Sequence, residues 1–201
     1  LSLPECLPNC TDEDKDELTE RGLIEGPIVQ AIDSAQTTVS FSMYTFSRKP
    51  IYRAWVRAAA RGVRVSGIMD RGQFRSILDQ CSPTEGCTAP EPFASDEYRS
   101  LPVREREAFL EGNELFRSAS NTEKLALLFL GTDSMVKPAP GSRRLVHNKY
   151  VFIDDRLLLN GSGNWSSTAV SINMENLARL TRESHPQIVE AFVCSFTVLW
   201  S

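Results

Sequence analysis

The stretch that decides the fold runs from Val146 to Ser166 and reads VHNKYVFIDDRLLLNGSGNWS. Its two apolar runs, HNKYVFIDD and RLLLNGS, predict two β-strands. The polar residues from Asp154 to Arg156 lie between the runs and are typical of a tight turn. The stretch therefore predicts a β-hairpin with polar residues at both ends.

The histidine at the head of this hairpin is one of only two in the chain. Because side chains alternate along a strand, His147 and Lys149 share a face with Val151, whereas Tyr150 and Phe152 share the other face. A neighbouring ammonium group disfavours the imidazolium form of a histidine and can also bind a phosphate oxygen. The pair therefore indicates a nucleophile aimed at a phosphodiester.

The segment after the second strand offers hydrogen-bond donors. Gly161, Ser162 and Asn164 supply backbone N–H groups, a hydroxyl and an amide, and such donors suit a tetrahedral anion. Taken singly, a histidine on a strand is more often structural, and Gly-Ser-Gly-Asn is most often a turn. The joint pattern H-x-K-x4-D-x6-G-S-x-N specifies six residues between His147 and Asn164, and this combination favours a functional site.

Helical and strand patterns alternate in the chain before the hairpin. Apolar residues recur at helical spacing from Ile24 and precede the strand pattern TTVSFSMYTF. The helix pattern KPIYRAWVRAAARG has Pro50 at its start and Gly62 as its stop, and VRVSGIMD is a strand that ends at Asp70. This order with short connections predicts a layered α/β domain with parallel neighbours.

We expect one globular domain over 24–201, preceded by an acidic N-terminal arm over 1–23 and carrying an insertion at about 73–143. The periodicity fails from Arg71 to about Pro92, and helical patterns resume in DEYRSLPVREREAFLEG and NTEKLALLFLG. DSMVKPAPGSRR is expected to be a loop. The closing HPQIVEAFVCSFTVLW predicts a buried amphipathic helix that contains a buried thiol.

Charge limits the partners that the chain can attract. A formal net charge of −4 gives no chain-wide attraction to nucleic acid. Positive charge gathers only in VKPAPGSRRLVHNK, where Lys137, Arg143, Arg144 and Lys149 occur without an acid between them, and a solvated basic loop would look the same. No apolar run reaches the roughly 18 to 20 residues of a membrane span, so we expect no stable membrane insertion.

Four of the five cysteines form two close pairs, Cys6 with Cys10 and Cys81 with Cys87. In an oxidising compartment each pair could close a small loop, and this favours a secreted or periplasmic protein. A start at Leu1 rather than Met also suggests processing. Zinc is the competing interpretation, but the spacings are wide and no histidine lies near either pair.

The spaced residues of the hairpin resemble the HKD motif of the phospholipase D superfamily. The matching residues are His147, Lys149 and Asp154, followed by Gly161, Ser162 and Asn164. The flanking helix and strand patterns resemble the family as well, and only the segment 73–143 departs from it. The resemblance implies a phospholipase D-like layered α-β-α domain with a mixed, largely parallel central sheet.

The family's chemistry implies covalent catalysis without a metal or other cofactor. His147 would attack phosphorus and form a phosphohistidine, while a second histidine protonates the leaving oxygen and then activates water. Lys149, Ser162 and Asn164 would hold the non-bridging oxygens of the transition state.

Further residues complete the implied site. Glu175, in NMEN, matches the acidic residue that orients the nucleophilic histidine in family members. Asp154 is expected to fix the strand turn rather than to carry a proton. Arg143 and Arg144 would contact a polyanionic substrate.

The implied mechanism needs a second motif that this sequence lacks. His185 has no lysine two residues on, and it is predicted to lie at a helix N-terminus ahead of Pro186. Single-motif family members solve this by forming a homodimer around a shared active site. The alternative is that the chain is one half of a longer, two-motif protein.

Chains of this size with one motif resemble bacterial Nuc-type endonucleases and mitochondrial cardiolipin hydrolase relatives. We therefore predict a nuclease that cuts DNA or RNA, with a phospholipase acting on phosphatidyl headgroups as the alternative. A non-catalytic binding module is a further possibility. A serine hydrolase that uses Ser162 is disfavoured, because no nucleophile elbow of the G-x-S-x-G type surrounds this serine. The related tyrosyl-DNA phosphodiesterases replace the motif aspartate, so Asp154 argues against that assignment.

Overall fold

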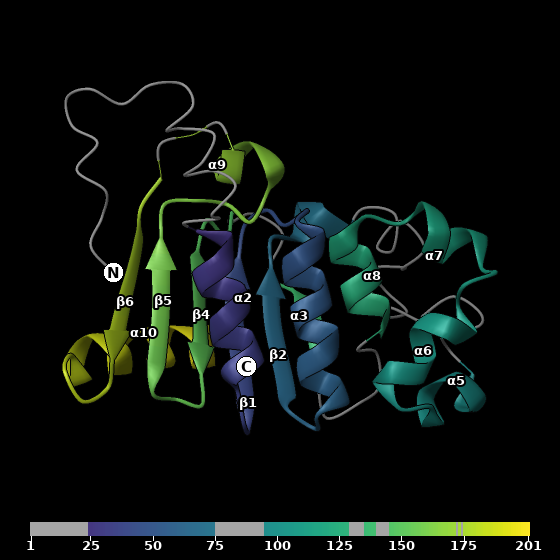
Figure 1. Ribbon diagram of the computed structural model, residues 1–201, viewed down its shortest axis with the longest axis horizontal. Helices are drawn as coiled ribbons and strands as arrows, with labels where there is room; N and C mark the ends of the chain where they lie inside the picture. Colours follow the sequence, from purple (N-terminus) through teal and green to yellow (C-terminus); the bar gives the residue numbers. More distant parts are fainter. Residues whose placement is uncertain (1–23, 75–94, 129–134, 140–144, 172, 174) are drawn as a thin grey trace.

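A six-stranded sheet forms the middle layer of the molecule (Figure 1). The computed structural model describes residues 24–74, 95–128, 135–139, 145–171, 173 and 175–201. The sheet has the order β3-β2-β1-β4-β5-β6. Its strands are β1 (Thr38–Met43), β2 (Arg64–Met69), β3 (Met135–Pro138), β4 (Lys149–Ile153), β5 (Leu157–Gly161) and β6 (Leu177–Thr181). The predicted N-terminal arm and the two cysteine pairs lie outside the described residues.

Among the six strands of the described sheet, only β1, β2 and β3 pair in parallel. β4 runs antiparallel to β1, forms the predicted hairpin with β5, and β5 pairs antiparallel with β6. The mixed, layered α/β architecture is confirmed, but the expectation of a largely parallel sheet is wrong. The hairpin turn between β4 and β5 is too short for the crossover that parallel neighbours require.

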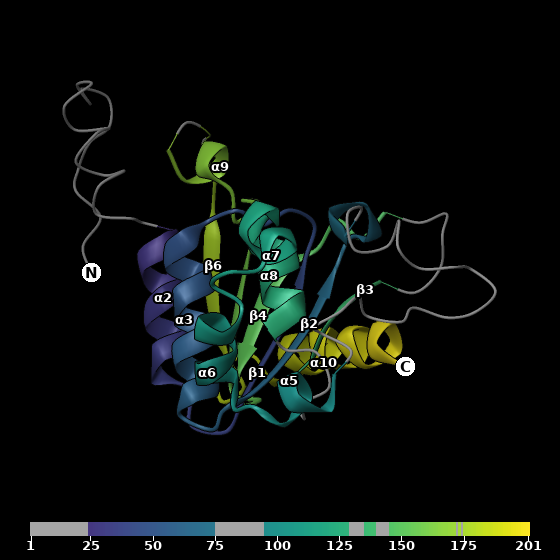
Figure 2. The same cartoon turned by 90° about the vertical axis from the view of Figure 1, so that its right-hand side faces the viewer.

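Two helices cover one face of the sheet, α2 (Glu25–Ser34) and α3 (Lys49–Ala60) (Figures 1 and 2). Apolar residues at helical spacing point inward, and Trp55 of α3 stacks on Phe41 of β1 with ring centroids 4.5 Å apart. α3 is followed by Gly62 at φ +85°, as its sequence predicts, because glycine adopts this left-handed conformation without steric cost.

The opposite face is covered by α10 (Pro186–Trp200), which packs on Tyr150 and Phe152 (Figure 2). The expectation of a buried helix is wrong, and so is the expectation of a buried thiol. Only Val189 of α10 is buried, whereas Cys194 is exposed and Val198 is 73% exposed. A single helix lying on a sheet buries one side only. Among the described helices, none is both long and apolar enough to span a bilayer.

The segment 73–143 contributes four described helices beside α3. They are α5 (Asp96–Ser100), α6 (Val103–Phe109), α7 (Glu114–Ser118) and α8 (Asn121–Leu128), after the 3-10 turn η1 (Arg71–Phe74). The two predicted helical stretches are confirmed. The predicted loop 133–144 is wrong in part, because β3 pairs in parallel with β2 and adds an edge strand to the sheet. The short helix α9 (Ser167–Ser171) lies between β5 and β6.

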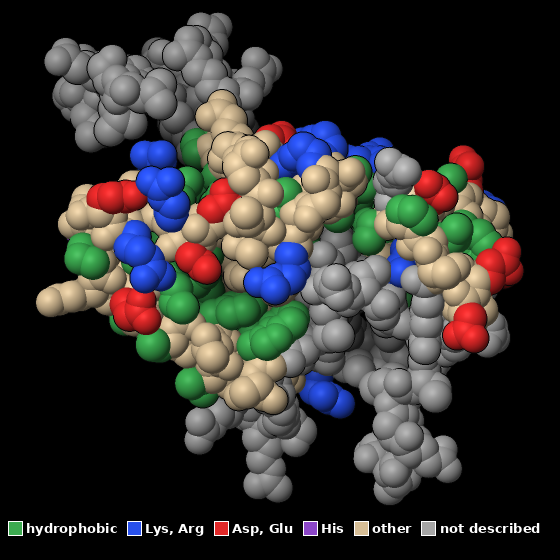
Figure 3. Space-filling model, turned by 90° about the horizontal axis from the view of Figure 1, so that it is seen from below, with side chains coloured by type: hydrophobic (Ala, Val, Ile, Leu, Met, Phe, Trp, Pro, Cys, Tyr) green, Lys and Arg blue, Asp and Glu red, His purple; other side chains and the backbone are tan. Residues whose placement is uncertain are grey.

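Loops gather at two opposite edges of the sheet. At the first, which we call the site edge, β1 ends at Met43 beside the start of β4 at Lys149, and β5 ends at Gly161 beside the start of β6 at Leu177. At the second, the hairpin edge, the turn 154–156 joins β4 to β5. Figure 3 looks at this second edge, where basic and acidic side chains are interspersed. The antiparallel hairpin thus brings both of its outer ends to the site edge.

Candidate active site

His147 lies two residues before the start of β4 on the site edge, and its side chain is exposed. The backbone on either side is anchored to other strands. Val146 donates its N–H to the Asp70 carboxylate at 3.1 Å, and the Asn148 carbonyl accepts the Tyr44 N–H at 2.9 Å. The imidazole lies against the Tyr44 ring, with centroids 5.0 Å apart. An exposed ring on a fixed backbone is the arrangement that a nucleophile needs.

Lys149 begins β4 and folds back toward His147. Its Nζ donates to the His147 carbonyl at 2.9 Å and lies 5.8 Å from the centroid of the Tyr44 ring. The side chain is only 8% exposed. Burial lowers the pKa of Lys149 below its ordinary value, and the negative charge of Glu175 partly offsets this. The structure therefore brings the predicted histidine and lysine together.

The predicted alternation along β4 is confirmed by the two layers that cover the sheet. Val151 belongs to the core beneath α2 and α3, whereas Tyr150 and Phe152 pack against α10.

Glu175 and Ser162 form a hydrogen-bonded pair across the ends of β5 and β6. The Ser162 hydroxyl donates to Glu175 Oε2, and Asn173 Nδ2 donates to Glu175 Oε1 at 3.0 Å. The same hydroxyl accepts the Asn176 N–H at 3.0 Å. Hydrogen bonds from Ser162 and Asn173 hold the pKa of Glu175 below its ordinary value, as does the charge of Lys149. Among the described residues, Glu175 makes no hydrogen bond to His147, the residue it is predicted to orient.

The glycine at position 161 has a packing reason. A Cβ atom on Gly161 would lie 2.1 Å from the Asn176 carbonyl oxygen, because the ends of β5 and β6 approach closely. A Cβ atom on Gly163 would be less crowded, at 3.3 Å from Cγ of the Glu175 side chain. These glycines let Glu175 reach Ser162. The motif positions predicted as phosphate donors thus also serve to bring β6 into the site.

Asn164 and Trp165 continue the loop after β5. Asn164 Oδ1 is buried and has no hydrogen-bond partner among the described residues. The next residue ties this loop to the loop after β1, since the Trp165 carbonyl accepts the N–H groups of Ser47 and Arg48 at 2.7 and 3.1 Å. The two loops that flank His147 and Ser162 are therefore joined through Trp165.

Asp154 lies at the other end of β4, on the hairpin edge. Its carboxylate accepts the N–H groups of Gln36, Thr37 and Thr38 at 3.0, 2.8 and 2.9 Å, and the Thr37 hydroxyl at 2.8 Å. Since a strand rises about 3.3 Å per residue, roughly 20 Å separate Asp154 from His147. Asp154 thus fixes the turn, as predicted, and it stands outside the group of residues around His147. A serine hydrolase triad of Ser162, His147 and Asp154 is excluded by the same distance.

Not every predicted substrate contact can be placed. Arg143 and Arg144 lie outside the described residues, and Lys137 lies in β3. Nor do three His, Cys, Asp or Glu side chains gather into a possible metal site anywhere in the part of the chain that the structure describes.

Asp70 is a site residue that sequence reasoning did not identify. The sequence marks it only as the end of a strand, and its bond to Val146 joins residues 76 positions apart.

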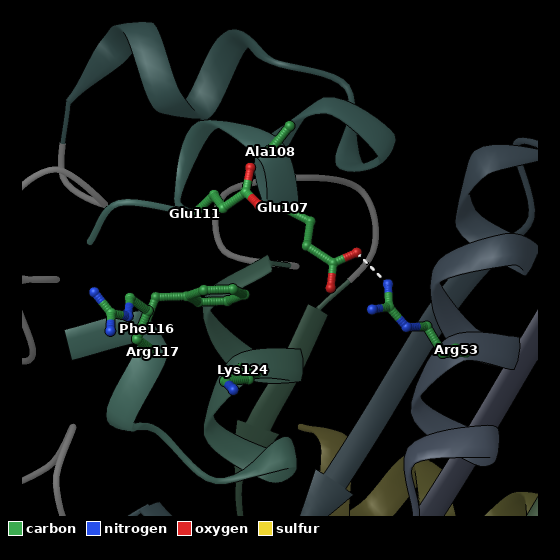
Figure 4. Close-up of a pocket in the computed structure, with 7 residues that line it drawn as sticks. All are labelled: Arg53, Glu107, Ala108, Glu111, Phe116, Arg117 and Lys124. Carbon is green, nitrogen blue, oxygen red and sulfur yellow. Dashed lines mark hydrogen bonds and ion pairs between the residues drawn. The ribbon is translucent and has the colours of Figure 1, made fainter. Parts of the chain in front are cut away.

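A surface pocket of about 530 Å³ lies away from these residues (Figure 4). Its lining comes from α3, from the helices α6 to α8 and from the turn between α6 and α7: Arg53, Glu107, Ala108, Glu111, Phe116, Arg117 and Lys124. Figure 4 shows the Arg53 guanidinium directed at the Glu107 carboxylate, which it contacts at 2.7 Å. Lys124 Nζ lies 5.6 Å from the centroid of the Phe116 ring. None of the predicted site residues lines this pocket, so it is distinct from the candidate active site.

Comparison with known families decides the identity. Residues 28–200 match the family described as cardiolipin synthase, PLD-like domain. This chain belongs to the phospholipase D superfamily. The resemblance carried by the HKD residues is thereby confirmed. Phosphodiesterase chemistry is the reaction class of this superfamily.

Two curated relatives and two solved structures are similar to this phospholipase D-like chain in sequence or in fold. A 55-residue segment is 46% identical to mitochondrial cardiolipin hydrolase of Chlamydomonas reinhardtii and 42% identical to that of Danio rerio, over 27% of this chain and 23% of each relative. The fold is similar to that of Nuc, a phospholipase D family member from Salmonella typhimurium (TM-score 0.55, 20% identity, 88% of this chain and 86% of that one). NucT from Helicobacter pylori is similar too (TM-score 0.54, 18% identity, 92% and 90%).

Proposed function

We propose that this phospholipase D-like protein is a metal-independent phosphodiesterase that cuts nucleic acid through a covalent phosphohistidine. The observation that carries the proposal is the pairing of an exposed His147 with a buried Lys149, whose Nζ lies 2.9 Å from the His147 carbonyl. The imidazole and the ammonium group both lie near the Tyr44 ring, so the ammonium group can hold a phosphate oxygen while the imidazole attacks phosphorus.

The first step forms a nitrogen–phosphorus bond and breaks the phosphorus–oxygen bond of the scissile ester. The leaving oxygen takes a proton from a second histidine. That second histidine, now neutral, accepts a proton from the water molecule that attacks phosphorus and releases His147. Lys149 and the amide of Asn164 stabilise the negative charge that builds on the non-bridging oxygens. Ser162 holds Glu175, which keeps a negative charge near Lys149.

The second histidine comes from a second copy of the chain. The only other histidine of the sequence, His185, is the N-cap of α10, and its Nδ1 is bonded to the Ser184 hydroxyl at 2.8 Å. It follows β6 at the hairpin edge, where Thr181 pairs with Leu157. His185 is therefore remote from His147, and a twofold axis beside the site edge would supply the missing acid.

Two observations bear on the substrate. The basic residues Lys137, Arg143, Arg144 and Lys149 favour a polyanion such as DNA or RNA. A phospholipid headgroup is the second candidate, because the curated relatives are cardiolipin hydrolases and Leu145, two residues before His147, is 61% exposed. An exposed leucine beside the nucleophile would suit an acyl chain.

A parallel assay distinguishes the two substrates. The protein is incubated in EDTA with plasmid DNA, single-stranded DNA, RNA, and vesicles that contain phosphatidylcholine or cardiolipin. We expect cleavage of nucleic acid by the wild-type protein and none by His147→Ala. Turnover of lipid alone would replace the nuclease by the phospholipase, and no turnover of any of these phosphodiesters would overturn the proposed function.

The shared site is tested by mixing wild-type protein with His147→Ala under conditions of subunit exchange. A mixed dimer lacks either its nucleophile or its acid, so activity should fall toward the square of the wild-type fraction. Sedimentation should show the active species to be a dimer. A fully active monomer would contradict the dimer.

A further inference from the structure

Asp70 is one of the few charged side chains that the fold buries, and it is 7% exposed. It follows β2 at the site edge. Its Oδ1 accepts the Gly72 N–H at 2.9 Å, and its Oδ2 accepts the Val146 N–H at 3.1 Å. No Lys or Arg among the described residues forms an ion pair with it. Burying a carboxylate costs free energy unless hydrogen bonds compensate for the lost water. The two backbone N–H groups supply this compensation, so we take the binding of these groups to be the role of the Asp70 side chain.

The second of these bonds reaches the residue before His147. On the other side of His147, the Asn148 carbonyl accepts the Tyr44 N–H at 2.9 Å, and Asn148 Nδ2 donates to the Ser42 hydroxyl at 3.1 Å. His147 thus stands between an anchor from β2 and anchors from the region of β1. Its imidazole makes no hydrogen bond to any described residue, so the backbone and the Tyr44 contact set the position of the ring.

We propose that Asp70 is a positioning residue for His147, holding the Val146 peptide so that the imidazole stays where it can attack phosphorus. This inference rests on the proposed function in taking His147 as the nucleophile. The main-chain bond acts one residue from the reacting ring, so its loss would let the ring move. A misplacement of about 1 Å can lower the rate of a reaction on the order of 100-fold.

Two substitutions of Asp70 remove its hydrogen bonds in steps. Asp70→Asn keeps one acceptor oxygen but turns an amide N–H₂ toward a backbone N–H, so one of the two bonds is lost. Asp70→Ala loses both. The matched control is Glu123→Gln, because Glu123 is also 7% exposed and accepts a backbone N–H, that of Ser120, at 2.9 Å.

Kinetics on the substrate that the wild-type protein cleaves form the first test. We expect kcat to fall about tenfold in Asp70→Asn and about 100-fold in Asp70→Ala, with KM within about twofold, because binding groups such as Lys149 stay in place. Glu123→Gln should keep the wild-type kcat per folded molecule. A wild-type kcat in a folded Asp70→Ala, or equal losses in Asp70→Asn and Glu123→Gln, would overturn the inference. If Asp70→Ala does not fold, Asp70→Asn decides in the same way.

The second test does not depend on turnover. The chain has only two histidines, so labelling the imidazoles gives two sets of NMR signals, which His185→Ala assigns. In Asp70→Asn we expect the His147 signals to shift or broaden while those of His185 stay fixed, and Glu123→Gln should move neither. Unchanged His147 signals in Asp70→Asn would refute the positioning role. Absence of phosphodiesterase activity in the wild type, together with moved His147 signals, would instead refute the proposed function alone.

Discussion

The site edge and the hairpin edge share one motif but put it to different uses. His147 and Lys149 stand at the start of β4 with an exposed imidazole and a buried ammonium group. Asp154 stands at the far end of the same strand and accepts hydrogen bonds from the residues that lead into β1. The spacing between lysine and aspartate is therefore the length of a strand. A motif that is continuous in sequence need not be one site in space.

The two edges also differ in how their charged side chains are placed. At the hairpin edge, exposed cations meet exposed acids, as in Arg156 with Glu183 at 2.7 Å and Arg182 with Glu190 at 3.0 Å. Exposed pairs of this kind contribute little to stability, because water and salt screen them. At the site edge Lys149 is buried against a carbonyl oxygen, where burial lowers its pKa. Substitutions at the two edges should therefore separate activity from stability.

The largest effect is expected at His147. His147→Ala should lower kcat by at least about 10,000-fold, because the covalent step has no substitute nucleophile. Its melting temperature should stay near that of the wild type, since the side chain is exposed. His185→Ala is the control and should keep full activity. Activity of His147→Ala within about tenfold of the wild type would end the assignment of the nucleophile.

Lys149→Ala comes next. It should lower kcat about 100-fold to 1,000-fold, as the loss of an oxyanion donor does. An effect on KM alone would mean that Lys149 only binds substrate. Because the pKa of Lys149 is lowered, its ammonium group loses its charge at a lower pH than that of an ordinary lysine. The kcat of the wild type should therefore begin to fall at that lower pH. Lys149→Arg should remove this alkaline fall, because arginine stays charged.

Glu175→Gln should have a smaller effect, on the order of tenfold in kcat. Glu175 raises the pKa of Lys149 by its negative charge, so its removal should move the alkaline fall of kcat to still lower pH. The pH profile of kcat measures this shift. An unmoved alkaline limb would show that Glu175 does not act on Lys149.

Asp154→Asn should leave kcat per folded molecule within about twofold and lower the free energy of unfolding by about 1 to 3 kcal/mol. Asn tolerates the positive φ of 51° at this position, so the backbone turn can persist. Chemical denaturation measures the stability. A large loss of kcat in the folded variant would show that the two edges are coupled.

The same residue gives the hairpin edge a dependence on pH. Burial opposes the charge of Asp154, but hydrogen bonds from Thr38, Gln36 and Thr37 outweigh it and lower the pKa of the carboxyl group. The stabilisation is therefore complete above the unfolded pKa of about 3.9 and is lost as the pH falls through the lower folded value. The unfolding free energy of Asp154→Asn should change less with pH in this range than that of the wild type.

Features with local causes could be predicted from the sequence. Strand alternation, a polar turn and a glycine stop placed the hairpin, α2 and α3, because their periodicity and turn chemistry lie within a few residues. The alternation in β4 separated Val151, which lies beneath α2 and α3, from Tyr150 and Phe152, which pack against α10. Burial could not be predicted in the same way, because it depends on which other element packs against a helix or strand. α10 was expected to be buried because its apolar residues fit a buried amphipathic helix, but only Val189 of this helix is buried.

The sequence by itself determined the superfamily, the strand that carries the HKD residues and the identity of the nucleophile candidate. Only the tertiary structure decided that β3 and β6 complete the sheet, that the Ser162 hydroxyl donates to Glu175, and that Asp70 holds the peptide before His147. The reason is physical. A hydrogen bond between residues 76 positions apart leaves no periodicity in the sequence, and its donor is a backbone N–H that every residue except proline carries.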